Sequence, residues 1–122
     1  MKTEKEQGIL VVELARADFA DPLALNESFE RLILQEGEKK ILVDLSAIDY
    51  MTSLQLGIIV GLHIMAYENV AVLKFSGLTE RVKMLFRLLG IDTLVEMHYG
   101  TAQAIESFGA SPGERPRPFG DA

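Results

Sequence analysis

The 122-residue sequence contains no cysteine, and positive charge is scarce in it. The absence of cysteine excludes disulfides, thiolate chemistry and cysteine-based zinc sites. There are 12 lysines and arginines against 18 acidic residues, which gives a net charge of -6. This balance argues against non-specific binding of nucleic acid, which needs cations that displace counterions. It also argues against an electrostatic attachment to anionic lipid.

The sequence also lacks a long hydrophobic run. Its longest apolar stretch is Leu54–Ala66, which is interrupted by Gln55 and His63 and is shorter than the roughly 20 residues of a membrane-spanning helix. The charged segment Met1–Gln7 has no apolar centre of the kind that a signal peptide needs. These features predict a cytoplasmic protein without direct membrane insertion.

The overall composition is that of a soluble globular protein, with 48% hydrophobic and 25% charged residues. The length suits one domain with a substantial core. From Gly109 onward the sequence reads GASPGERPRPFGDA, and a segment dominated by glycine, proline and charge is typical of disorder. We therefore predict a folded domain over residues 1–108 and a disordered C-terminal tail over residues 109–122.

Strand and helix patterns alternate along the domain. Apolar and β-branched runs predict strands over residues 9–14, 41–45, 71–76 and 94–97, with a short edge strand as an option within 1–7. Apolar residues at helical spacing, each set preceded by a capping residue, predict helices over 22–36, 53–68, 80–89 and 102–108, the last of them capped by Thr101. This alternation predicts a two-layer α/β fold: a mixed, mainly parallel sheet of four to five strands with about four helices.

The segment Lys40–Gly61 contains the clearest candidate site. A nearly continuous apolar strand ends in a polar turn, and Thr52-Ser53-Leu54-Gln55 then has the form of a capping box. The helix start would lie at the C-terminal end of a central strand, which is where open α/β sheets place their functional sites.

The helix that follows is apolar on most sides, which predicts a buried helix. Gly57 and Gly61 each cost about 1 kcal/mol of helix stability relative to alanine, so we expect them to allow a close approach of the helix to the sheet. His63 is expected to be an ordinary packed or half-exposed helix residue. In the next helix, the predicted inward stripe is Val82, Leu85, Phe86 and Leu89.

No catalytic constellation is visible in the sequence. His63 and His98 lie on different elements, and no carboxylate stands at helical spacing beside either of them to suggest a metal site. Asp44 and Asp49 flank the turn and could hold a cation, although solvated turn carboxylates are far commoner. We therefore expect neither an enzyme nor a cofactor or metal site.

Ser53 has two interpretations from the residues alone. It could only cap its helix together with Thr52, which would explain both residue types. It could instead be a phosphoacceptor, because a phosphoryl group at a helix N-terminus gains backbone N–H donors and the favourable helix dipole. The sequence leaves both interpretations open.

Two segments resemble the STAS domain of the anti-sigma factor antagonists. The strand that ends in Val43-Asp44-Leu45-Ser46 leads to a segment resembling the family pattern M-D-S-S/T-G-L-G, and the helix with Val82, Leu85, Phe86 and Gly90-Ile91 resembles the pattern V-x-x-L-F-x-x-x-G-L. The similarity covers roughly residues 8 to 108. The phosphorylation motif diverges, because Thr52 stands where the family has Asp and Leu54-Gln55 replaces Ser/Thr-Gly.

The resemblance implies a cytoplasmic regulator. Members of this family bind an anti-sigma factor, often itself a serine kinase, and so free a sigma factor; phosphorylation of the serine that matches Ser53 breaks the complex. The partner-binding residues implied here are Thr52, Ser53, Leu54 and Gln55, together with an acidic residue at the start of the first helix, for which Asp21 is the nearest match and Asp18 the other option.

The resemblance also allows a second role. The chain could be a STAS module without a phosphorylation switch, acting as a scaffold subunit of a signalling complex or as the cytosolic subunit of a lipid-transport ABC system. Both roles imply a protein partner and no nucleic acid, and a homodimer is compatible with either.

Overall fold

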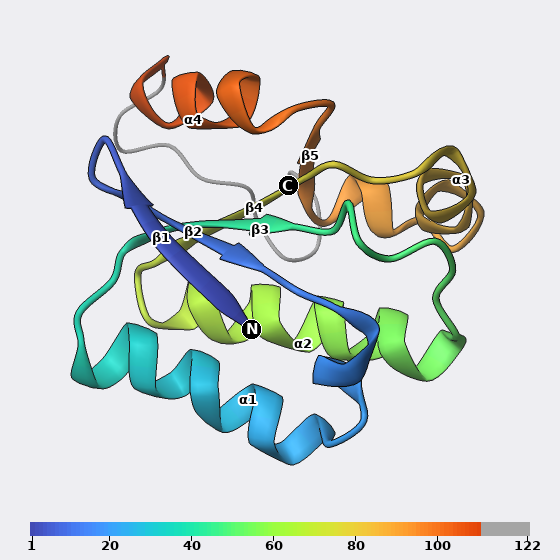
Figure 1. The fold of residues 1–122 in the computed structure, drawn as a ribbon, viewed down its shortest axis with the longest axis horizontal. Helices are drawn as coiled ribbons and strands as arrows, with labels where there is room; N and C mark the ends of the chain where they lie inside the picture. Colours follow the sequence, from blue (N-terminus) through green and yellow to red (C-terminus); the bar gives the residue numbers. More distant parts are fainter. Residues whose placement is uncertain (111–122) are drawn as a thin grey trace.

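A computed structural model describes residues 1–110 of the chain as a five-stranded sheet with helices on both of its faces (Figure 1). The strands are β1 (Lys2–Glu6), β2 (Ile9–Glu13), β3 (Lys40–Asp44), β4 (Val72–Ser76) and β5 (Glu96–His98). The α-helices are α1 (Pro22–Glu30), α2 (Ser53–Glu68), α3 (Glu80–Leu88) and α4 (Thr101–Ala110). Apart from its first two residues, the predicted tail lies outside the described residues.

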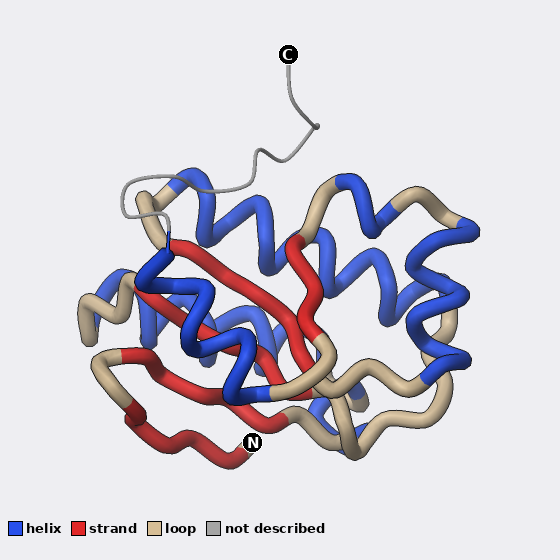
Figure 2. The backbone as a smooth tube through the Cα atoms, turned by 90° about the horizontal axis from the view of Figure 1, so that it is seen from above, coloured by secondary structure: helices blue, strands red, loops and turns tan. Residues whose placement is uncertain are grey.

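The strands lie side by side in the same order as in the sequence (Figure 2). β1 pairs with β2 in antiparallel fashion, and the pairs β2–β3, β3–β4 and β4–β5 are all parallel. The prediction of a mixed, mainly parallel α/β sheet with four helices is therefore confirmed. Within the described residues, no helix is long and apolar enough to cross a membrane.

The core lies on both faces of the sheet. On one face, α1 and α2 pack against inward residues such as Val43 and Phe75. On the opposite face, Ile105 and Phe108 of α4 pack against Leu42. Helix α4 thus adds a partial layer on the second face, beyond the two layers that the sequence predicts. The physical reason is visible in β3, whose successive apolar side chains point to opposite faces and require cover on both.

Most helix starts agree with their predicted caps. Asp21 accepts a hydrogen bond from the Ala24 amide at 3.1 Å, and Thr79 accepts one from the Val82 amide at 3.3 Å. The first helix differs beyond its start, because α1 ends at Glu30 and a π-helical turn continues over Arg31–Gln35. Leu89 was predicted to face inward, but it lies at the C-terminal end of α3 and is 56% exposed.

A buried lysine fastens α4 to the sheet. The Lys74 ammonium lies 2.9 Å from Oε2 of Glu96 and donates a hydrogen bond to Oγ of Ser107, also at 2.9 Å. It also sits 4.6 Å from the centre of the Phe108 ring. Burial raises the pKa of Glu96, but hydrogen bonds from Lys74 and His98 outweigh it and hold the pKa below its ordinary value.

His63 is packed into the core as predicted, at 3% exposure. Neither of its ring nitrogens has a hydrogen-bond partner among the described residues. Two such unpaired polar atoms cost free energy on burial. Burial also lowers the pKa of His63 below its ordinary value of 6.5, because the charged imidazolium is disfavoured in the core.

We predict that the free energy of unfolding falls as the pH is lowered below 6.5. The unfolded chain binds a proton at His63 at a higher pH than the folded chain does, so the stability contribution is complete above that value and is lost below it. A His63→Leu variant should be about 1 kcal/mol more stable at neutral pH. It should also lose part of the pH dependence in urea denaturation curves. His98 is present in both proteins, so an unchanged difference across the pH range would contradict the prediction.

Candidate functional site

The turn between β3 and α2 is held by contacts from both of its ends. The Leu45 amide bonds to the Ser76 carbonyl at 2.9 Å, and the Ser46 amide bonds to Oδ1 of Asp44, also at 2.9 Å. Ile48 and Met51 are almost completely buried in the core. The polar turn is therefore fixed in position rather than free in solvent.

Gly77 allows the chain after β4 to pass close to this turn. Its φ is +73°, and a Cβ atom on it would lie 2.7 Å from Oδ1 of Asp44. Both the left-handed backbone and the close approach require glycine here. The Asp44 carboxylate thus stabilises the turn by accepting the hydrogen bond from the Ser46 amide. Within the described residues, no group of three or more His, Cys, Asp or Glu side chains could hold a metal ion.

The start of α2 is a complete capping box. Oγ1 of Thr52 accepts a hydrogen bond from the Gln55 amide at 3.2 Å, and the Thr52 amide donates to Oε1 of Gln55 at 3.0 Å. Ser53 is the first residue of the helix and is exposed. Its hydroxyl has no hydrogen-bond partner within residues 1–110. The capping of the helix therefore does not involve the Ser53 side chain, and the Ser53 hydroxyl is available for other chemistry.

Two exposed apolar side chains lie close to Ser53 in the sequence. Leu54 is 71% exposed and Tyr50 is 49% exposed. The neighbouring helix α3 is tied to the turn by a hydrogen bond from Thr79 to the Asp49 carbonyl at 3.5 Å. The outer side of α3 also exposes three large apolar side chains, namely Met84, Leu88 and Leu89.

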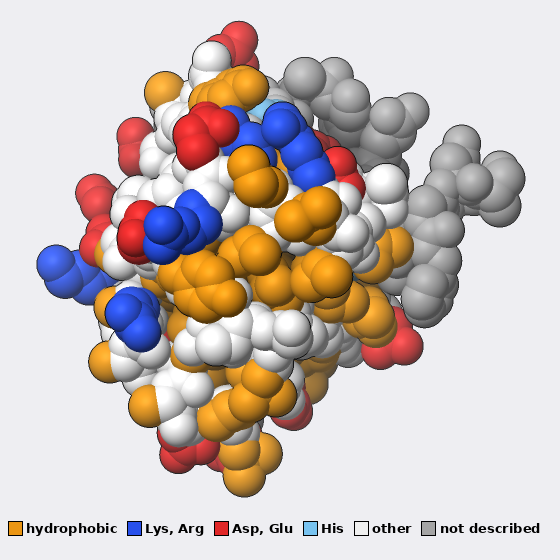
Figure 3. All heavy atoms as spheres, turned by 90° about the vertical axis from the view of Figure 1, so that its right-hand side faces the viewer, with side chains coloured by type: hydrophobic (Ala, Val, Ile, Leu, Met, Phe, Trp, Pro, Cys, Tyr) orange, Lys and Arg blue, Asp and Glu red, His pale blue; other side chains and the backbone are white. Residues whose placement is uncertain are grey.

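We refer to these exposed residues together as the α2–α3 patch: Tyr50, Leu54, Met84, Leu88 and Leu89. Figure 3, which views this end of the molecule, shows apolar side chains gathered on one face with lysine and arginine side chains beside them. Arg81 and Arg87 are the exposed cations of α3. The Arg81 guanidinium is 3.9 Å from the Asp49 carboxylate, and both groups are largely in solvent, so this ion pair contributes little stability.

Asp21 and Ser53 both lie where a helix begins after a parallel strand, at the same edge of the sheet (Figure 1). Asp21 is exposed and caps α1. The alternative residue, Asp18, is already engaged: it accepts a hydrogen bond from the Ala15 amide and pairs with the Met1 amino group at 3.0 Å. Burial raises the pKa of Asp18, but these two partners outweigh it and lower the pKa overall.

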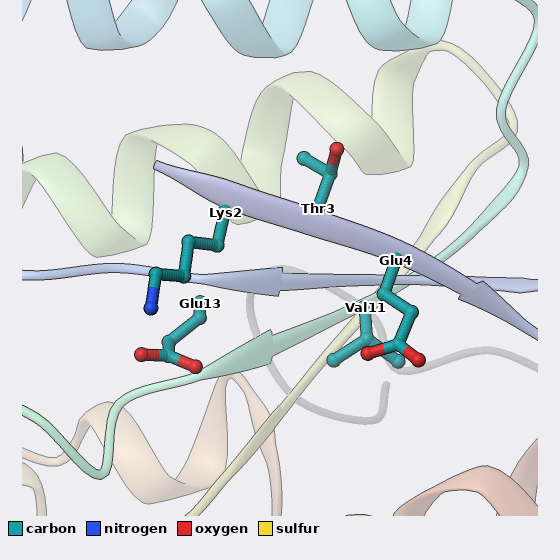
Figure 4. Close-up of a pocket in the computed structure, with 5 residues that line it drawn as sticks. All are labelled: Lys2, Thr3, Glu4, Val11 and Glu13. Atoms are coloured by element: carbon teal, nitrogen blue, oxygen red, sulfur yellow. The ribbon is translucent and has the colours of Figure 1, made fainter.

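A shallow hollow of about 420 Å³ lies elsewhere, on the sheet beside its open edge (Figure 4). It is lined by Lys2, Thr3, Glu4, Val11 and Glu13. These residues belong to β1 and β2, away from the start of α2, and they contain no nucleophile–base pair. The hollow is therefore separate from the candidate site.

The sequence prediction for the glycines of α2 is wrong. Gly57 and Gly61 are exposed, and no heavy atom lies within 4 Å of the position that a Cβ atom would take on either of them. The helix buries Leu56, Ile59 and Leu62 toward the sheet and leaves its other side in solvent. A helix that is apolar all round gives no sequence signal for which side faces inward.

We predict that Thr52→Ala lowers the free energy of unfolding by about 1 kcal/mol, because it removes the cap. Ser53→Ala should change it by less than about 0.5 kcal/mol, because the Ser53 hydroxyl supports no contact in the fold. Chemical denaturation of the two variants beside the unchanged chain measures both values. Equal losses for the two substitutions would mean that Ser53 shares the capping role.

None of the curated proteins compared with the chain matches it. Several solved structures share its fold. A variant of RsbS from Moorella thermoacetica has a TM-score of 0.79 at 12% identity, over 90% of this chain and 97% of its own. A chain from the stressosome, a signal integration and transduction hub, has a TM-score of 0.77 at 14% identity, over 89% and 96%.

An anti-sigma-factor antagonist (STAS) domain protein from Planctomyces limnophilus has a TM-score of 0.70 at 11% identity, over 88% of this chain and 97% of its own. At such low identities these likenesses concern the fold. The sequence itself matches the family model of the STAS domain over residues 1–104, nearly the whole described part. The chain therefore belongs to the STAS domain family.

Proposed function

We propose that this chain is a regulatory protein-binding module of the anti-sigma factor antagonist type. In its unmodified form it binds an anti-sigma factor that is itself a serine kinase, and phosphorylation of Ser53 breaks that complex. The observation that carries this proposal is the exposed Ser53 with an unused hydroxyl, at the start of a capped helix and next to exposed apolar side chains. STAS membership supports the proposal.

The position of Ser53 suits a phosphoryl group. The first turn of a helix has backbone N–H groups without helical partners, and its dipole favours negative charge. The cap leaves the Ser53 and Leu54 amides free of side-chain partners, because Thr52 engages only the Gln55 amide. A phosphoryl group can therefore be held here without unfolding the helix.

A phosphoryl group on Ser53 would also weaken the contact with a protein partner. Leu54 and Tyr50 expose apolar surface beside Ser53, and a protein partner would bury that surface. A phosphoryl group adds a charge of about -1.5 to -2 at neutral pH. A partner could cover it only at the cost of its desolvation, so phosphorylation would weaken binding directly.

The divergent motif fits this role with one difference. Thr52 stands where family members have an acidic residue, and it caps the helix without bringing a charge next to Ser53. Leu54 follows the acceptor and is 71% exposed, so a kinase must accommodate a leucine there. We assign Thr52, Ser53, Leu54 and Gln55 to the partner surface, with Asp21 at the same edge of the sheet.

The second candidate is a STAS module without the switch, either a scaffold subunit of a signalling complex or the cytosolic subunit of a lipid-transport ABC system. The same exposed α2–α3 patch would bind a protein partner, but Ser53 would stay unmodified. An adjacent gene for a histidine-kinase-like ATPase would favour the switched module, and an adjacent ABC permease gene would favour the second candidate. Both candidates are cytoplasmic and neither is an enzyme.

We predict that incubation with the cognate serine kinase and Mg-ATP adds one phosphoryl group, and that Ser53→Ala abolishes this modification. Intact-mass spectrometry and peptide mapping measure it. Thr3→Val keeps Ser53 and serves as the matched control, because Thr3 is exposed on β1, outside the proposed partner surface, and its loss should leave the phosphorylation unchanged. A chain that binds the kinase and stays unphosphorylated at Ser53 would rule out the switch and leave the scaffold role.

We further predict that Ser53→Asp weakens binding of the kinase by at least about tenfold, which corresponds to about 1.4 kcal/mol. Titration calorimetry with the purified partner measures the change. Gln103→Asp is the control, because Gln103 is an exposed residue on α4, on the opposite face of the sheet. Equal affinities of Ser53→Asp and the unchanged chain would contradict a partner contact at Ser53.

A further inference from the structure

The outer side of α2 is an apolar helix face in solvent. The helix has 16 residues, and its sequence from Ser53 to Tyr67 contains no acidic residue, lysine or arginine. The side opposite the core exposes Leu54, Gly57 and Gly61 and half-exposes Ile64. A helix that is apolar all round is normally covered on every side. Residues 1–110 leave this side of α2 uncovered.

The two glycines give this face its shape. A Cβ atom on Gly57 or Gly61 would meet open space, so nothing inside the described part of the chain requires glycine at either position. Both residues lower helix stability relative to alanine. Without Cβ atoms they leave a notch between Leu54 and Ile64, and a side-chain ridge of another helix can pack into such a notch.

We propose that a second copy of this chain covers the outer side of α2, with the two α2 helices packed antiparallel about a two-fold axis near Gly61. We place the axis at the middle of Ser53–Glu68, between Val60 and Gly61, so that the two helices overlap over their whole length. In this register, Ile64 of each copy faces Gly57 of the other. The notch of one helix thus receives the ridge of its partner, as a self-complementary two-fold contact requires.

The distribution of charged residues favours the outer side of α2 as the self-association face. A two-fold contact brings each residue close to its own copy or to a nearby residue, and a chain with a net charge of -6 repels its copies over most of its surface. The exposed sides of the other three helices carry charges, for example Glu27 on α1, Arg87 on α3 and Glu106 on α4. Within the described helices, only the outer side of α2 lacks charge over its central turns.

The one charged residue of this face also suits an antiparallel contact. Glu68 is exposed at the C-terminal end of α2. Antiparallel packing places it near Ser53 of the other copy, at the positive end of that helix. A parallel arrangement would instead bring the two Glu68 carboxylates together. The charge of Glu68 therefore favours the antiparallel two-fold.

The absence of cysteine permits a direct test with single-cysteine variants. Gly61→Cys should form a disulfide-linked dimer under mild oxidation, because the axis brings the two Cys Cα atoms within the range of about 4.4–6.8 Å that a disulfide needs. Leu23→Cys is the matched control, since Leu23 is 67% exposed on α1, away from the proposed contact. Non-reducing electrophoresis measures the yields. Equal yields for the two variants would overturn the proposed axis.

Sedimentation equilibrium of the unchanged chain should show a concentration-dependent monomer–dimer equilibrium. Gly57→Leu fills the notch and should raise the dissociation constant at least tenfold, with the helical circular dichroism signal retained. Ser53→Asp should also raise it, because it places a second carboxylate near Glu68 of the other copy. A strictly monomeric chain at millimolar concentration would overturn the proposal and leave this face to a different protein. These measurements use the pure protein, so their outcome is independent of the kinase experiments above.

Discussion

The packing of one side of α2 against the sheet determines the rest of the functional surface. Leu56, Ile59 and Leu62 enter the same core as Val43 and Phe75, so the rotation of the helix about its axis is fixed. The capping box then fixes where the helix begins. Ser53 is consequently held at the surface, and the glycine side of the helix faces water. Burial of one side of α2 thus creates both surfaces that we propose for binding.

The two proposed contacts share one helix and are therefore coupled. A kinase that reaches Ser53 must approach the N-terminal turn of α2, and a second copy packed antiparallel covers the same turn with its Glu68. The two partners would compete for α2, because both cannot occupy that turn together. A phosphoryl group on Ser53 would disfavour both contacts through its charge. Phosphorylation would then release a monomer that binds neither partner at this face.

Features that depend on neighbours in sequence could be predicted, and features that depend on tertiary contacts could not. The capping box links Thr52 to a residue three positions later, so the sequence contains both partners. The alternation of strands and helices along the sequence likewise predicted the mainly parallel sheet. The outward side of Gly57 and Gly61 was missed, because an apolar helix carries no periodic signal for its exposed side. The role of Lys74 was also missed, because its partners Glu96 and Ser107 are distant in sequence.

His63 connects the stability of the core to this surface. It lies on the buried side of α2, two residues after Gly61. Its ring nitrogens have no hydrogen-bond partners within the described residues. Burial disfavours a proton on His63, so acidification weakens the packing of α2 against the sheet rather than any contact at its outer side. The helix that presents Ser53 and the glycine notch is the same rigid element. Weaker packing of α2 at low pH would therefore affect the phosphoacceptor and the self-association face together.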